Sequence, residues 1–238
     1  MLGIVNVVGS TIARECARGI YLHAGPEIAV VSTKTFTSTA VAFALLAIHL
    51  GRIRDLSTAQ GARLLKALEA LPAQVAEILA QEPHIAKLAK ELAHRDSAYF
   101  VGRAAGYPVA MEGALKLKEI SYIHAEAYPA SELKHGPLAL ISPETPTVVV
   151  MPRDDLFAKN VSTLEEIRAR GGPLYVITQA GELLPIAVNG IIEVPKSEAE
   201  LDPLLLNIPL QLLAYHVALA KDRDIDQPRN LAKSVTVE

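Results

Sequence analysis

The sequence has no tryptophan, and aromatic residues make up only 5% of its 238 positions. We therefore expect an aliphatic core, and the 50% hydrophobic share suffices for one large domain or two small ones. Cys16 is the single cysteine, so an internal disulfide is excluded. A lone thiol is typical of a reducing compartment, and we expect a cytoplasmic protein.

An excess of one sign of charge is also missing. The formal net charge is -3, and basic and acidic residues are mixed along the chain. This pattern offers no basic field for nucleic acid and no polybasic surface for a membrane. Of the longest apolar stretches, 40–50 is too short to span a bilayer, and 204–220 is interrupted by polar residues and a proline. We expect neither nucleic acid nor membrane as a partner.

Cofactor motifs are absent as well. The sequence contains no G-x-G-x-x-G fingerprint, no Walker loop and no Cys/His cluster with metal-ligand spacing. Nicotinamide and metal chemistry therefore have no support, and we expect no cofactor and no metal.

What the sequence does contain is an alternation of β-branched runs with helical patterns. The expected strands are 2–8, 98–102, 147–151, 174–178 and 190–194, and the expected helices are 11–19, 36–51, 56–79, 83–94, 107–121, 154–170 and 203–220. Such an alternation predicts an α/β fold with a mainly parallel sheet covered on both faces. Active sites of such sheets lie at the carboxyl ends of the strands, where the turn at Gly102-Arg103 is expected.

The expected helix 107–121 carries a charged stripe. Glu112, Lys116 and Glu119 fall on one face, and most of the remaining surface is apolar. Charge on a buried helix is costly unless it is paired. Either Glu112 pairs with Lys116 on a face exposed to water, or the stripe lines a polar pocket in which Glu119 moves protons.

Three other stretches leave a structural and a chemical reading open. His135 precedes Gly136-Pro137, so it is either a surface residue or an acid/base group held in a rigid loop. The run 32–35 either caps the next helix or binds an anion. Lys233, near the terminus, is either solvated or an amine nucleophile docked over a pocket.

Several of these stretches together resemble one family. Segments 27–34, 112–128, 132–140 and 226–238 are similar to the isomerase part of the glutamine–fructose-6-phosphate aminotransferases (isomerising), or glucosamine-6-phosphate synthases. The resemblance implies sugar-isomerase (SIS) domains. The expected fold is a three-layer αβα SIS-type parallel sheet, with one complete SIS domain at 84–238 preceded by a partial one, with linking helices, at 1–83.

The resemblance also implies roles. Glu119 is the base that moves a proton between C1 and C2 of fructose 6-phosphate, and Lys233 forms an imine with the ketose. His135 helps to open the sugar ring and reaches the site of a neighbouring subunit, so a homodimer or higher oligomer is expected. The residues expected to line or adjoin the sugar site are Glu27, Val30, Ser32, Lys116, Arg229 and Ala232.

Two parts of the family pattern have no counterpart here. One is the glutaminase domain with its amino-terminal cysteine nucleophile, and the other is a Ser-Gln-Ser-Gly-Glu-Thr loop that holds the sugar phosphate. We therefore expect a fragment whose partners are a sugar phosphate and the missing glutaminase domain. Two alternatives remain, a non-catalytic SIS module that binds a sugar phosphate and a simple aldose–ketose isomerase.

Overall fold

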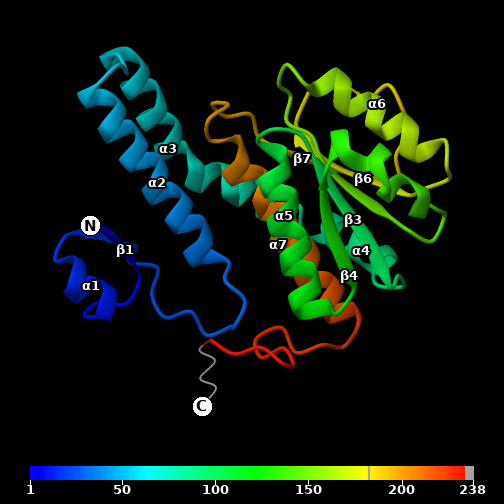
Figure 1. Ribbon diagram of the computed structural model, residues 1–238, viewed down its shortest axis with the longest axis horizontal. Coiled ribbons are helices and arrows are strands. Elements are labelled where there is room, and N and C mark those ends of the chain that lie inside the picture. The colour runs from blue at the N-terminus through cyan, green and yellow to red at the C-terminus, as the bar shows by residue number, and fades with distance from the viewer. Residues whose placement is uncertain (182, 234–238) are drawn as a thin grey trace.

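The computed structural model describes residues 1–181 and 183–233, and its largest sheet, the central layer between helices, has five parallel strands (Figure 1). The strand order is β4-β3-β5-β6-β7. The bounds are Ser97–Gly102 for β3, His124–Pro129 for β4, Thr147–Val150 for β5, Leu174–Gln179 for β6 and Gly190–Val194 for β7. The predicted parallel α/β sheet is confirmed.

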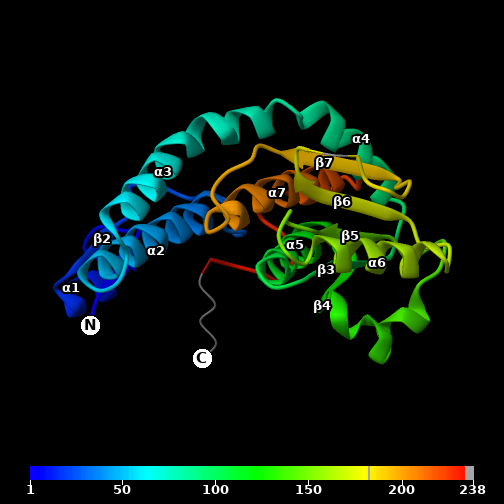
Figure 2. The ribbon, with the colours of Figure 1, turned by 90° about the horizontal axis from the view of Figure 1, so that it is seen from above.

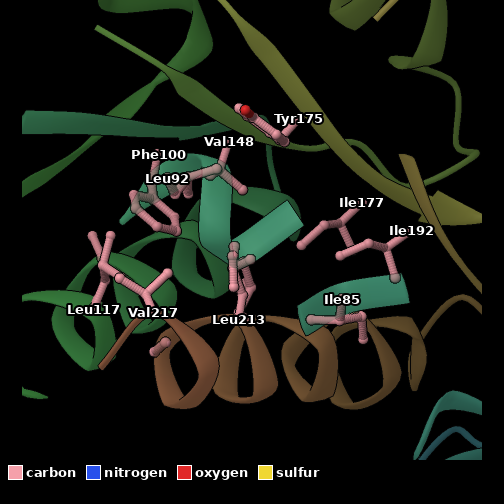
Figure 3. Close-up of a cluster of buried hydrophobic side chains, with 14 of the residues drawn as sticks. Ile85, Leu92, Phe100, Leu117, Val148, Tyr175, Ile177, Ile192, Leu213 and Val217 are labelled. Atoms are coloured by element: carbon pink, nitrogen blue, oxygen red, sulfur yellow. The ribbon is translucent and has the colours of Figure 1, made fainter. Parts of the chain in front are cut away.

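Helices cover both faces of this sheet (Figure 2). One face packs against α4 (Glu82–Leu92), α5 (Gly106–Ser121) and α7 (Asp202–Ala220), and the other against α6 (Phe157–Arg168). The alternation along β3 explains the two layers, because Phe100 enters one core while Val101 enters the other. Figure 3 shows the first core, in which Phe100 lies close to Leu117 of α5 and below Val148 of β5.

Residues 1–21 form a much smaller unit. Strands β1 (Gly3–Val5) and β2 (Gly19–Tyr21) pair in parallel, and α1 (Thr11–Cys16) connects them. The Ser10 side chain caps α1 by accepting the Ala13 N–H at 3.4 Å. The expectation of a buried strand over 2–8 is wrong, since β1 is three residues long and only Gly3 is buried. Two strands and one short helix are too few to enclose a core.

Two long helices, α2 (Lys34–Ile53) and α3 (Thr58–Leu79), lead from this unit to the central sheet (Figures 1 and 2). A capping box between Ser57 and Gln60 starts α3. Leu71 and Ile78 of α3 are buried in the core that also contains α7. The predicted domain boundary at 83/84 falls at the start of α4, and the division into a partial and a complete domain stays a prediction.

Helices α2 and α7 are both long and apolar enough to cross a bilayer, with mean hydropathy 1.5 and 1.4. In α7 56% of the apolar window is buried, as in a core helix, whereas in α2 only 11% is buried. The length argument against a membrane span is wrong for the first apolar stretch, because it belongs to a helix of 20 residues. Length and apolarity alone remain weak evidence for a membrane.

Strand β4 was not expected from the sequence. Its residues, His124 to Pro129, include three helix-favouring ones, Ala125, Glu126 and Ala127. Pairing with β3 in parallel register overrides that preference, because it satisfies the backbone along the sheet edge. The chain then enters two short 3₁₀ turns, Ala130–His135 and Pro137–Leu140, instead of an irregular loop.

Candidate active site

Glu119, the candidate base on α5, lies toward the edge of the sheet where the strands begin, whereas Glu112 lies near the middle of the helix. Helix α5 starts just after the carboxyl end of β3, runs back over 16 residues, and ends immediately before β4 begins. Glu119 is therefore near the amino edge, about 20 Å along the helix from the Gly102 turn. The start of α5 lies at the carboxyl edge as predicted, Glu119 lies toward the other end of the helix, and the location of the active site stays a prediction. Chain segments other than strand ends complete the site.

The charged stripe on α5 is an ion-pair chain. The Lys116 Nζ lies 2.8 Å from Glu119 Oε2 and 3.3 Å from Glu112 Oε1. Lys116 is 4% exposed and Glu112 9% exposed, so the reading in which this stripe faces water is wrong for both. Burial raises the pKa of Glu112, although the Lys116 charge opposes the rise. Glu119 is half-buried, and its side chain is more open to solvent than that of Lys116.

A second carboxylate, that of Glu27, occupies the amino end of α2. It accepts hydrogen bonds from the backbone N–H groups of Thr33 at 3.2 Å and Thr35 at 3.4 Å, and from the Thr35 hydroxyl at 2.6 Å. The free N–H groups and dipole of a helix start favour an anion. The sequence left open whether 32–35 caps the helix or binds an anion. In the structure the anion bound there is the chain's own Glu27.

Lys233 reaches the same carboxylate from the other end of the chain. Its Nζ donates to Glu27 Oε2 at 2.9 Å, across 206 positions of sequence. Burial alone would raise the pKa of Glu27, but the Thr35 hydroxyl, the Lys233 ammonium and the two N–H groups outweigh it and lower the pKa to about 2. The reading of Lys233 as a docked lysine is thus favoured over a freely solvated one. Residues 234–238 of the matching segment lie outside the described residues.

A cavity of about 170 Å³ is lined by Lys116 of the first cluster and by Thr33, whose N–H binds Glu27 of the second. Lys116 of α5 lines it together with Val31 and Thr33 of the loop before α2 and Asp226 of the tail. The loop and the tail are also joined directly, since the Val30 N–H donates to the Asp226 carbonyl at 2.9 Å. One pocket wall thus brings together α5, the loop 27–33 and the carboxyl-terminal tail.

The other predicted site residues divide into two groups. Ser32 adjoins the cluster, with its hydroxyl 2.6 Å from that of Thr35, and Arg229 and Ala232 lie exposed on the tail. His135 is exposed at the end of the first 3₁₀ turn, beyond the carboxyl end of β4. The structure therefore does not bring His135 together with Glu119, which lies at the opposite edge of the same sheet.

Two residues that the sequence did not single out also touch this site. Thr35 binds the Glu27 carboxylate with both its hydroxyl and its N–H. Tyr122, just after α5, accepts a hydrogen bond from the Arg229 N–H at 2.8 Å. The hydroxyl-rich run containing Thr35 was a usable signal, whereas no local pattern marks Tyr122.

The fold and the match to a family model establish the class of this protein. Residues 91–221 match the SIS domain model, which covers more than half of the chain, and the chain belongs to the SIS domain family.

Curated relatives are similar over the entire chain. It is 49% identical over 238 residues to the glutamine–fructose-6-phosphate aminotransferase (isomerizing) of Escherichia coli, and 48% identical over 239 residues to that of Thermus thermophilus. The chain spans only 39% and 40% of the length of these two relatives.

A solved structure agrees with this relation. The C-terminal domain of glucosamine-fructose-6-phosphate aminotransferase from Francisella tularensis superposes with a TM-score of 0.91 at 40% identity, over 95% of this chain and 64% of that one. Together with the sequence relatives, this similarity supports the resemblance stated from the motifs.

Proposed function

We propose that this chain carries the sugar-converting site of a glutamine–fructose-6-phosphate aminotransferase, which makes glucosamine 6-phosphate from fructose 6-phosphate and ammonia. The observation that carries the proposal is the pairing of Lys233 with Glu27, whose hydrogen-bond donor Thr33 lines the same cavity as Lys116. A lysine brought there from a distant tail supplies an amine, and the neighbouring α5 supplies a carboxylate, Glu119, for proton transfer.

The proposed reaction begins at the amine. After Lys233 gives up a proton, its nitrogen adds to the C2 carbonyl of the open-chain ketose, and water leaves to form an imine. Ammonia then replaces the lysine on C2 and the lysine amine departs. The imine makes the C1 hydrogen acidic, so Glu119 removes that proton while the imine nitrogen gains one, which gives an enolamine. The C1 hydroxyl then loses its proton as the C1 carbonyl forms and C2 receives one, leaving an aldose with an amine on C2.

The remaining residues hold and open the sugar in this proposal. Ser32, Val30, Arg229 and Ala232 border the place where the sugar binds, and His135 opens the ring in the site of a second copy of the chain. We further propose a cytoplasmic homodimer, a division into an incomplete SIS domain at 1–83 and a complete one at 84–238, and a glutaminase domain as the source of ammonia. Light scattering at micromolar concentration tests the dimer, and a monomer mass would contradict it.

Borohydride reduction in the presence of radiolabelled fructose 6-phosphate tests the chemistry. The expected result is label fixed to Lys233, located by peptide mass spectrometry, because borohydride reduces an imine to a stable secondary amine. Millimolar sugar is appropriate, since we expect the chain alone to bind weakly. Sugar binding without fixed label would favour a non-catalytic SIS binding module. Interconversion of ketose and aldose without fixed label or incorporation of ammonia would favour a simple isomerase.

A further inference from the structure

The carboxyl-terminal tail, residues 221–233, is fixed along its path by several anchors. The Asp224 carboxylate accepts the N–H groups of Asp226 and Gln227, both at 2.9 Å, which turns the chain back after α7. Ile225 packs against the core, and Pro228 is buried. The tail is therefore docked up to Pro228, and what holds the segment beyond it determines where Lys233 lies.

Tyr122 makes the next set of contacts. Its hydroxyl accepts the Arg229 N–H at 2.8 Å, and its ring lies 4.2 Å from the Arg229 guanidinium and 5.4 Å from that of Arg223. Both distances lie within the range of cation–π attraction. Tyr122 itself has φ 63°, a left-handed conformation that ends α5. One aromatic side chain thus contacts the tail at two arginines.

The contacts of Tyr122 connect two segments that carry candidate catalytic residues. It lies three residues after Glu119, and Arg229 lies four residues before Lys233. Four residues span at most about 14 Å, so fixing Arg229 keeps the Lys233 backbone within that distance of Arg229. Residues 229–233 are exposed, so the segment gains little from burial. Among the described residues, two contacts attach this segment to the rest of the chain. Arg229 binds Tyr122 at one end, and Lys233 pairs with Glu27 at the other.

We propose that Tyr122 is a positioning residue, which ties the tail to α5 so that the Lys233 amine stays beside Glu27 and within reach of the sugar that Glu119 acts on. This inference rests on the proposed function for the part that concerns the sugar. The tie between Tyr122 and the tail is independent of any reaction.

Two substitutions separate the contributions of the hydroxyl and the ring. Tyr122→Phe keeps the ring and removes the acceptor for the Arg229 N–H, and Tyr122→Leu removes both. We expect Lys233 to form the imine about 3- to 10-fold more slowly in the first variant and about 10- to 100-fold more slowly in the second. The maximal trapping rate should fall, because the amine is displaced from its position beside Glu27.

Tyr128→Phe is the matched control. Tyr128 is half-buried, and among the described residues its hydroxyl has no hydrogen-bond partner, while its ring packs against Tyr99. Trapping should stay at the parental rate in this variant.

The rate at which acetic anhydride acetylates Lys233, measured without sugar by mass spectrometry, reports how accessible the amine is. We expect faster acetylation in the order parent, Tyr122→Phe, Tyr122→Leu, since release from Glu27 exposes the amine. The inference is overturned if both variants trap sugar and acetylate at parental rates, or if trapping slows while acetylation is unchanged. If the parent fixes no sugar, the proposed function fails, and the acetylation order still decides whether Tyr122 holds Lys233 in place.

Discussion

The candidate site contains two lysine–carboxylate pairs that are built in opposite ways. Lys116 and Glu119 are three residues apart on α5, and Lys116 is almost completely buried. Lys233 and Glu27 come from the tail and from the loop before α2, and the Lys233 side chain is 43% exposed. The first pair exists wherever α5 is helical, whereas the second exists only while the tail is docked.

This difference suits the two chemical tasks proposed for the pairs. A base must keep its place relative to the reacting carbon, and a rigid, buried helix provides that. An amine that forms and releases an imine must leave its ion pair in each turnover, and an exposed pair worth little in free energy permits that release. The two pairs should therefore respond differently to substitution.

The largest expected effect is at the tail pair. Lys233→Ala should abolish borohydride trapping of the sugar completely, because no amine remains to form the imine. The fold should be unaffected, since the side chain is solvent-exposed on the tail. Lys159→Ala, at an exposed position of α6, is the control and should trap at the parental rate. Label bound to the Lys233→Ala variant would place the imine on another lysine.

Glu119→Gln should show the opposite behaviour. The amide keeps the shape but cannot accept the proton, so exchange of the C1 hydrogen with solvent should fall about 10²–10⁴-fold. Lys116 keeps its other partner, Glu112, so the helix should remain folded and Lys233 should still trap the sugar. Exchange is measured by deuterium incorporation at C1. Exchange at the parental rate would exclude Glu119 as the base and return the charged stripe to a structural role.

Glu27→Gln should have a smaller effect that is confined to the tail pair. An amide cannot pair with the Lys233 ammonium, and its NH₂ group is a poorer match for the N–H groups of Thr33 and Thr35. We expect trapping to slow about 3- to 10-fold, in line with the loss of an exposed ion pair. Glu15→Gln, on the exposed surface of α1, serves as the control. Parental trapping in Glu27→Gln would mean that the tail is held without this pair.

The smallest effect is a pH dependence of stability. The pKa of Glu27 is lowered from 4.5 to about 2 in the folded chain, so its contribution is complete above pH 4.5 and is lost as the pH falls toward 2. Because Lys233 is exposed, screening should limit this contribution to about 1 kcal/mol. Urea unfolding of the parent and of Glu27→Gln should give free energies that differ at pH 6 and converge near pH 2. A constant difference over that range would contradict the role of the Glu27 charge.

Much of the fold was readable from local pattern. The strands at 97–102, 147–150, 174–179 and 190–194 are short apolar runs, the first three buried on both faces, and such runs predict a covered parallel sheet. Strand β4 was missed because Ala125, Glu126 and Ala127 favour helix, and only pairing with β3 makes them a strand. The helices α2 and α7 have similar length and mean hydropathy, although α2 is mostly exposed and α7 is mostly buried. The conformation of β4 and the burial of α2 and α7 depend on neighbouring elements that are distant in the sequence.

In the candidate site, too, local sequence pattern predicts some contacts and tertiary packing alone decides others. The sequence by itself placed Glu112, Lys116 and Glu119 on one face, because a helical repeat of 3.6 residues brings side chains three or four apart together whatever surrounds them. It also supplied, through the family resemblance, the identity of Lys233 and Glu27. Only the tertiary structure decided that these two meet, since their contact depends on α7 ending beside the loop before α2 and on Tyr122 holding the tail there. No periodic pattern in the sequence predicts a contact between residues 206 positions apart. It forms only when packing brings the two segments together.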